Sequence, residues 1–252
     1  MFFFHSFPFS AFFLSCSIFS EIASFCANSF TRYSNVEISI VIRNTFRIKR
    51  TKIIRNIKFV EELNNIDFVI ATGRNYPSLK EDLKIKCDYY ICNDGGYILD
   101  KDYNLIYRNY IDKKTVEIVY FRIKELGYNN YFFDNIDKFS KEIIDNVNKI
   151  SVKIQNDNPN DDIKYLLEGL DDIYAYISTN WINILSIDSK KSNGIDFITN
   201  LNNYDNIYVI GNDINDYDML KKYNGYFIGS SKNMDFNTIN NFLELKDIIK
   251  ND

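Results

Sequence analysis

Two short apolar runs, each ending in a polar loop with a glycine, most constrain the fold of this chain. Asp67-Phe68-Val69-Ile70-Ala71 leads into Thr72-Gly73-Arg74, and Val209-Ile210 leads into Gly211-Asn212-Asp213-Ile214-Asn215-Asp216. Apolar runs of this length are typical of buried strands, and strands that alternate with helical patterns indicate a parallel, doubly wound sheet. Because ligands bind at the carboxyl ends of strands in such sheets, these two loops are expected to border one site.

Hydrophobic periodicity predicts the other elements. For the larger domain we expect strands over 38–42, 89–92, 182–187, 207–210 and 226–228, a hairpin of 97–99 with 105–107, and helices over 51–63, 77–84, from 215 and from 236. Between residues 110 and 180 the pattern predicts helices over 115–126, 138–147 and 161–170, with strands over 131–133, 150–154 and 173–177. This second group predicts a compact α+β insertion between two halves of an α/β core.

Composition excludes several classes of function. The 252 residues suffice for one large domain or two small ones, and a net charge of −4 with dispersed lysines argues against nucleic acid as a partner. The four cysteines lack metal-type spacing and fit a reducing cytoplasm. His5 is the single histidine, which argues against Ser/His or Cys/His catalysis.

The composition changes near residue 47. Residues 1–46 contain 11 of the 21 phenylalanines but no lysine and no aspartate. We therefore expect residues 1–35 to lie outside the fold. A mis-read or frameshifted N-terminus ranks first as the explanation, a membrane anchor second and a secretion signal third, since Pro8 and several serines interrupt the apolar stretch and no basic region precedes it.

Three motifs in the rest of the chain resemble those of a known superfamily. Ala71-Thr72-Gly73-Arg74, Lys191-Ser192-Asn193-Gly194-Ile195-Asp196 and the loop from Gly211 to Asp216 look, in order and separation, like motifs II, III and IV of the haloacid dehalogenase (HAD) superfamily. The resemblance is to the Cof-type, subfamily IIB sugar-phosphate phosphatases and covers about residues 50–250. It implies a core formed by 36–107 and 181–252, a cap formed by 108–180, and Mg²⁺-dependent hydrolysis of small phosphorylated metabolites.

The resemblance also implies roles for individual residues. The Thr72 hydroxyl would bind a phosphoryl oxygen, with Gly73 and Arg74 beside it, and Lys191 would stabilise the phosphoryl charge. Asn93 in Asn93-Asp94-Gly95-Gly96 resembles a segment that borders the substrate phosphate, although this sequence is also a good turn.

The metal site implied by the resemblance consists of Asn212, Asp213 and Asp216. The family has an aspartate where this chain has Asn212, and an amide oxygen can ligate Mg²⁺ but supplies no charge. The same acidic loop could also serve as the cap of the following helix.

Motif I of the family, Asp-x-Asp-Gly-Thr, is absent, because no aspartate precedes Asp67 and no glycine precedes Gly73. Spacing places Val41 at the nucleophile position and Arg43 at the acid/base position, with Glu37 the nearest carboxylate. We therefore expect slow hydrolysis or none. The alternatives are a damaged reading frame, a pseudophosphatase that binds a phosphorylated ligand or a protein, and a membrane-tethered binding protein. The sequence does not specify the substrate.

Overall fold

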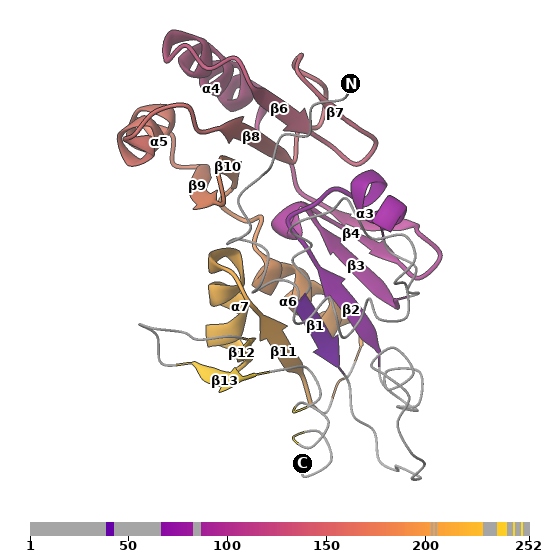
Figure 1. Ribbon diagram of the computed structural model, residues 1–252. Helices are drawn as coiled ribbons and strands as arrows, with labels where there is room; N and C mark the ends of the chain where they lie inside the picture. The colour runs from indigo at the N-terminus through magenta and orange to yellow at the C-terminus, as the bar shows by residue number, and fades with distance from the viewer. Residues whose placement is uncertain are drawn as a thin grey trace, which may run out of the picture.

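The computed structural model describes residues 39–42, 67–82, 87–202, 204, 206–228, 236–240, 244 and 248. Within these residues the strands form two sheets (Figure 1). The larger sheet has the order β13-β12-β11-β1-β2-β3-β4-β5, with β1 Ser39–Ile42, β2 Phe68–Ala71, β3 Tyr89–Cys92, β4 Tyr97–Asp100, β5 Leu105–Arg108, β11 Tyr208–Gly211, β12 Tyr226–Ile228 and β13 Asn237–Ile239.

Helices cover both faces of this larger sheet because its strands are apolar on both sides. Val69 and Ile91 pack with residues of α6 (Lys191–Leu201) and α7 (Tyr217–Lys222), whereas Ile70 and Tyr90 pack on the opposite face with α3 (Tyr76–Asp82). Alternate residues of a strand point to opposite faces, so a strand that is buried throughout needs a cover on each side.

The smaller sheet has the order β7-β6-β8-β10-β9 and lies above the larger one in Figure 1, together with α4 (Lys113–Glu125) and α5 (Pro159–Leu167). Its strands are β6 Tyr131–Asp134, β7 Phe139–Ser140, β8 Lys149–Lys153, β9 Ile173–Ser178 and β10 Trp181–Ser186. Phe133, Ile150 and Ile182 pack with apolar residues of α4 and α5. The alternate residues are left to face the other way, toward the larger sheet.

The predicted α/β core with an inserted α+β cap is confirmed, but the core sheet is mixed rather than parallel throughout. Its β2–β3, β11–β12 and β12–β13 pairs are parallel, and the β3–β4 and β4–β5 pairs are antiparallel. The exact domain boundaries at 35, 107 and 180 stay predictions.

The central strand β1 runs antiparallel to both of its neighbours. Ser39 is opposite Ala71 and Ile42 is opposite Phe68, while Ile40 is opposite Ile210 of β11. The predicted strand therefore exists, but its amino end lies beside the carboxyl ends of β2 and β11. Its carboxyl end, where a nucleophile would be presented, lies at the other edge of the sheet.

Three predicted elements differ from the structure. The strand expected at 182–187 in the core is β10, which pairs with β8 and β9 in the smaller sheet. The helix expected over 138–147 is replaced by β7 and turns, in which Asn135 accepts hydrogen bonds from the backbone of Asp137 and Lys138. Residues 237–239, expected to begin a helix, form β13.

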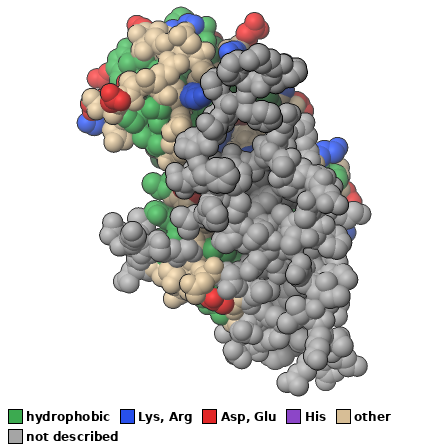
Figure 2. All heavy atoms as spheres, viewed as in Figure 1, with side chains coloured by type: hydrophobic (Ala, Val, Ile, Leu, Met, Phe, Trp, Pro, Cys, Tyr) green, Lys and Arg blue, Asp and Glu red, His purple; other side chains and the backbone are tan. Residues whose placement is uncertain are grey.

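The helix expected over 51–63, the leader 1–35, Glu37 and Arg43 lie outside the described residues. In the part that is described, no helix is long and apolar enough to cross a membrane. Figure 2 shows Lys, Arg, Asp and Glu side chains interspersed over the upper part of the molecule, in agreement with the dispersed charge of the sequence.

Candidate active site

The predicted motif loops meet at one edge of the core sheet. Thr72 follows β2, and Asn93 follows β3, the parallel neighbour of β2. The backbone N–H of Thr72 donates to Ile91 O (2.8 Å), and that of Asp94 donates to Thr72 O (2.9 Å). The two loops therefore continue the sheet pairing beyond the strands, which brings the motif II residues against the turn that follows β3.

That turn is a 3₁₀ segment, η2 (Asn93–Gly95), with left-handed backbone at consecutive residues. The φ angles are 47° at Asn93, 54° at Asp94 and 97° at Gly95. Gly95 is required sterically, because a Cβ there would lie 2.3 Å from the carbonyl oxygen of Lys190. The close approach fixes the residue immediately before α6 against the turn.

Lys191 is the first residue of α6, and tight packing of that helix sets its position. A Cβ on Gly194 would lie 2.8 Å from Cγ2 of Ile91, so the helix approaches β3 as closely as a glycine allows. Lys191 is only 1% exposed, and its Nζ lies 2.7 Å from Oδ1 of Asp216. This lysine is therefore a core residue of the site and not a solvated surface lysine.

The loop after β11 is organised around Asp216. Its Oδ2 accepts hydrogen bonds from the backbone N–H groups of Asn212 (2.8 Å) and Asp213 (3.1 Å). Asp213 in turn caps η3 (Ile214–Asp216) through Ile214 N–H, and its other carboxylate oxygen accepts from Ser178 Oγ of the cap (2.9 Å). The sequence motif thus combines helix capping with the positioning of Lys191.

Asp94, which the sequence analysis treated as part of a turn, is the central carboxylate of the site. It is 1% exposed, and it accepts hydrogen bonds from Lys149 Nζ (2.9 Å), Tyr176 OH (2.7 Å) and Asn215 Nδ2 (2.8 Å). Lys191 Nζ lies 3.8 Å from its Oδ1. Burial alone would raise the pKa of Asp94, but the two lysines outweigh it and lower the pKa to about 2.

Lys149 and Tyr176 are cap residues that sequence reasoning missed. Lys149 lies at the start of β8, and its Nζ also donates to Gly73 O (2.9 Å), so it links motif II to Asp94. The signal that could have found it is the strand alternation. Ile150 and Val152 face the cap helices, which leaves Lys149 and Ser151 facing the core loops.

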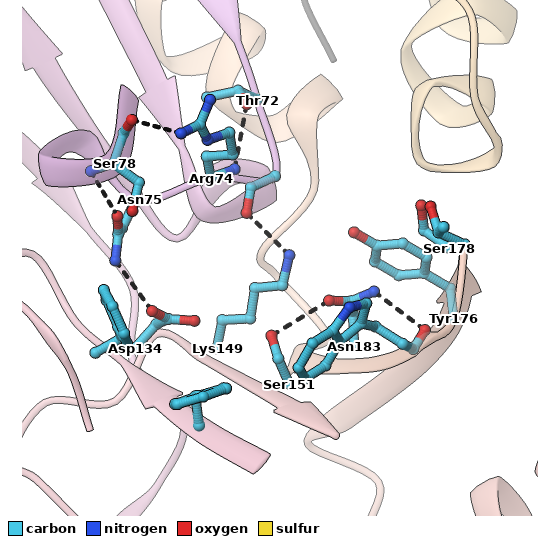
Figure 3. Close-up of a pocket in the computed structure, with 15 residues that line it drawn as sticks. Thr72, Arg74, Asn75, Ser78, Asp134, Lys149, Ser151, Tyr176, Ser178 and Asn183 are labelled. Carbon is cyan, nitrogen blue, oxygen red and sulfur yellow. Dashed lines mark hydrogen bonds between the residues drawn. The ribbon is translucent and has the colours of Figure 1, made fainter. Parts of the chain in front are cut away.

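A cavity of about 470 Å³ opens between the core loops and this face of the cap sheet (Figure 3). The core supplies the segment from Thr72 to Asn75 together with Ser78. The cap supplies aromatic and polar side chains: Phe132, Asp134, Phe139, Lys149, Ser151, Tyr176, Ser178, Thr179, Trp181 and Asn183. A cavity of this size suits a small metabolite.

A hydrogen bond spans this cavity from core to cap. Asn75 Nδ2 donates to Asp134 Oδ1 (3.0 Å), and Asn75 Oδ1 accepts from the backbone N–H of Ser78 (3.0 Å), as Figure 3 shows. Burial raises the pKa of Asp134 to about 6, although Lys149 and the Asn75 hydrogen bond oppose the rise.

Comparison with known proteins identifies the fold. A family model described as haloacid dehalogenase-like hydrolase matches residues 41–138. A solved structure of the subclass IIB sugar phosphatase BT4131 superposes with a TM-score of 0.59 at 16% identity, covering 77% of this chain and 87% of that one. The chain has the haloacid dehalogenase fold. The resemblance predicted from the three motifs is thereby confirmed.

Other solved structures with the HAD fold agree. BT1666, a HAD phosphatase from Bacteroides thetaiotaomicron, gives a TM-score of 0.62 at 16% identity over 77% of this chain and 83% of its own. A HAD-like hydrolase from B. subtilis gives 0.60 at 16% identity over 69% and 81%. No curated protein matches the sequence significantly. At these identities the structures establish the fold, and the chemistry has to be argued from the residues.

Of the four residues predicted to bind phosphate after β2 and β3, Gly73 has no side chain, and the side chains of the other three have different surroundings. Thr72 is fully buried, and its Oγ1 accepts a hydrogen bond from the backbone N–H of Arg74 (3.2 Å). The Arg74 guanidinium donates to Ser78 O at the start of α3 (2.5 Å). Asn93 is 0% exposed, and neither polar atom of its side chain has a hydrogen-bond partner among the described residues. Buried amides are rarely left unpaired, but Asn93 is not among the residues that line the cavity.

The described residues fit only part of a magnesium site. Asn212 Oδ1 is buried without a hydrogen-bond partner, as expected of a metal ligand, but both oxygens of Asp216 and of Asp213 already accept hydrogen bonds. No group of three or more His, Cys, Asp or Glu side chains in the described part of the chain could hold a metal ion. Because Mg²⁺ favours carboxylate ligands, the set present does not by itself form the implied site.

Proposed function

We propose that this chain has the scaffold of a Mg²⁺-dependent hydrolase of small phosphorylated metabolites of the sugar-phosphate type, and that it binds such phosphomonoesters but hydrolyses them slowly or not at all. The substrate class is that named for the solved sugar phosphatase of the same fold. A cytoplasmic location, expected from the cysteine content, remains part of the proposal.

Binding is supported by the groups that converge where motifs II, III and IV meet. Lys149 and Lys191 bring two buried ammonium groups to this point, and Tyr176 adds a hydroxyl. Asn93, which precedes Asp94 in the same turn, has a fully buried amide that lacks any partner in the described structure. Ammonium, hydroxyl and amide donors in a site shielded from water are the groups that bind phosphoryl oxygens strongly.

The direction of β1 is the observation that carries the loss of hydrolysis. In a HAD phosphatase, the first aspartate of motif I, between the loops of motifs II and IV, attacks phosphorus and forms an aspartyl-phosphate. Here the strand between β2 and β11 has its amino end at the site. None of its residues, Ser39 to Ile42, has a carboxylate, so no described residue of this strand can perform the attack.

Lys191 and Thr72 would then bind the phosphoryl group without promoting its transfer. This arrangement favours the pseudophosphatase among the alternatives for the chain as it stands, with a phosphorylated metabolite as the ligand. Loss of a covalent nucleophile typically costs several orders of magnitude in turnover.

The proposal is tested by restoring the missing motif. Residues 51–252 are fused to an apolar strand that ends in Asp-x-Asp-Gly-Thr, and phosphate release from hexose phosphates is measured with and without Mg²⁺. We expect Mg²⁺-dependent hydrolysis by the fusion, loss of it on Thr72→Val or Lys191→Met, and tighter metal binding on Asn212→Asp. Rapid Mg²⁺-dependent hydrolysis by the unmodified 252-residue chain would contradict the proposed impairment.

A further inference from the structure

Four hydrogen-bond donors or cations from four different elements surround the carboxylate of Asp94. Lys149 comes from β8, Tyr176 from β9, Lys191 from α6 and Asn215 from η3. Three of them contact the carboxylate at 2.7 to 2.9 Å, and Lys191 Nζ lies at 3.8 Å. Two ammonium groups, a phenol and an amide arranged around one point form a receptor for an oxyanion.

The turn itself does not require this carboxylate. Asp94 has φ 54° and ψ 32°, a left-handed conformation in which glycine costs less than any residue with a side chain. The side chain is therefore best explained by its contacts in the site and not by the backbone.

The carboxylate lies directly on the motif II backbone. A Cβ added to Gly73 would be 3.1 Å from both of its oxygens and 3.3 Å from Lys149 Nζ. Gly73 is one of the residues expected to contact a phosphoryl group, together with Thr72 and Lys191. The Asp94 carboxylate thus lies beside Gly73 and Lys191, two of the residues expected to contact a phosphoryl group.

Asp94 is the ion-pair partner of Lys149 at the centre of the site. Lys191 pairs with Asp216, whereas the only carboxylate within ion-pair distance of Lys149 in the described structure is that of Asp94. With Asp94 in place, the charge of Lys149 is already paired and is less available to attract a phosphate dianion. Removing the charge of Asp94 would leave the buried Lys149 ammonium with no described carboxylate within ion-pair distance, and a bound anion would then offset the cost of burying that charge.

We propose that the Asp94 carboxylate occupies the oxyanion position of the site, so that a phosphate or phosphomonoester has to displace it in order to bind. Asp94 thereby acts as an internal competitor that weakens ligand binding in the chain as it stands. This inference rests on the proposed function, since it concerns the same site.

The test compares the full chain with its Asp94→Asn variant, which keeps the shape of the side chain and removes its charge. Binding of inorganic phosphate is measured by titration calorimetry at about pH 7.5. We expect at least about a tenfold lower Kd for the variant, the size of a modest coupling between two ligands of one site. Phosphate should also raise the Tm of the variant more than that of the unmodified chain.

Two further variants separate this effect from damage to the fold. Asp162→Asn removes another buried carboxylate, which lies outside the cavity and accepts hydrogen bonds from Tyr128 and Asn156, so it should leave the Kd for phosphate within about twofold. Asp94→Gly, suited to the left-handed turn, should tighten binding as Asp94→Asn does. Adding Lys149→Met to Asp94→Asn should abolish the gain.

Equal or weaker phosphate binding by both Asp94 variants, with circular dichroism unchanged, would overturn the inference, as would an absence of phosphate binding in every variant. The proposed function fails separately. If Asp94→Asn binds inorganic phosphate tightly but neither protein binds a hexose phosphate, the internal competitor stands and the proposed ligand class falls. If the unmodified chain and Asp94→Asn bind a hexose phosphate with equal Kd, the proposed ligand class stands and the internal competitor falls.

Discussion

Lys191 Nζ lies 2.7 Å from Oδ1 of Asp216, and neither side chain is exposed to solvent. The pair joins the first residue of α6 to the loop after β11, two segments 25 residues apart in the sequence. A buried ion pair gains little over apolar packing, because both charges lose their hydration. Stability alone therefore does not account for this pair, in agreement with the proposed role of Lys191 in ligand binding.

Breaking this pair should be costly all the same. Lys191→Met leaves Asp216 and Asp94 buried with less positive charge nearby, and we expect the free energy of unfolding to fall by about 3–5 kcal/mol. Urea unfolding followed by circular dichroism measures the change. Lys222→Met is the matched control, since it removes the lysine of a partly exposed pair with Asp196 and should cost no more than about 1 kcal/mol. Equal losses in the two variants would contradict the structural role of Lys191.

Gly211 is the last residue of β11 and lies against Asp216. A Cβ at this position would be 2.4 Å from the Cβ of Asp216, so Gly211→Ala has to displace that side chain and, with it, Lys191. We expect a loss of about 1–3 kcal/mol in the free energy of unfolding, as for other overpacked sites, together with weaker phosphate binding. Urea unfolding and titration calorimetry measure the two effects.

Gly127→Ala provides the control for that loss. Gly127 has φ 75°, and a Cβ at this position would have nothing within 4 Å, so only the backbone conformation resists the substitution. It should cost about 1–2 kcal/mol and leave phosphate binding unchanged. Unaltered binding in Gly211→Ala would show that the close approach to Asp216 does not position the site.

The sequence predicted the position of a loop best where a strand leads directly into it. Thr72 and Asp216 follow buried strands and lie together because the carboxyl ends of β2 and β11 share one edge of the sheet. Lys149 and Tyr176 could not be found in this way. They come from cap strands that are distant in sequence, and only the packing of cap on core brings them to Asp94.

The predictions that were wrong have two physical causes. β10 was assigned to the core because its apolar residues, such as Ile182 and Ile184, would suit either sheet, and only strand pairing decides between them. Residues 138–147 have apolar residues at helical spacing, but Asn135 forms a local turn that competes with a helix. Periodicity therefore decides neither which sheet a strand joins nor whether a local turn replaces a helix.

The buried carboxyl of Asp134 predicts a pH dependence of stability. Its pKa rises from 3.8 to about 6 on folding, chiefly through burial, so the folded state binds more protons than the unfolded state between about pH 4 and pH 6. Stability should therefore fall as the pH rises through this window, by at most about 3 kcal/mol from this group. Because the pKa of Asp94 is lowered to about 2, this carboxyl contributes stability that is lost as the pH falls below about 4, outside the window set by Asp134.

The variant Asp134→Asn isolates this contribution, because its amide oxygen can still accept the hydrogen bond from Asn75. Unfolding free energies of the variant and the unmodified chain are compared at about pH 4.5 and about pH 7. The variant should gain relative stability at the higher pH. A constant difference between the two proteins across this range would show that Asp134 titrates at its ordinary pKa.

The reversed direction of β1 can be tested by cross-linking. In the antiparallel register Ser39 is opposite Ala71, whereas Phe68 is opposite Ile42 at the other end of the strand. Directly opposed residues of antiparallel strands have Cα atoms about 4.5–5.5 Å apart, a separation that a disulfide bridges. The pair Ser39→Cys and Ala71→Cys should therefore cross-link under mild oxidation, and the pair Ser39→Cys and Phe68→Cys should not. Mass spectrometry of proteolytic fragments identifies the bridge.

A parallel β1, of the kind expected for a strand that presents a nucleophile, would place Ser39 near Phe68 and reverse this outcome. The carboxyl end of β1 would then lie at the site, beside the loops that follow β2 and β11. That result would remove strand direction as a cause of the lost hydrolysis. The absence of a carboxylate from Ser39 to Ile42 would be left as the sole cause, and a single substitution at the end of β1 could then supply the nucleophile.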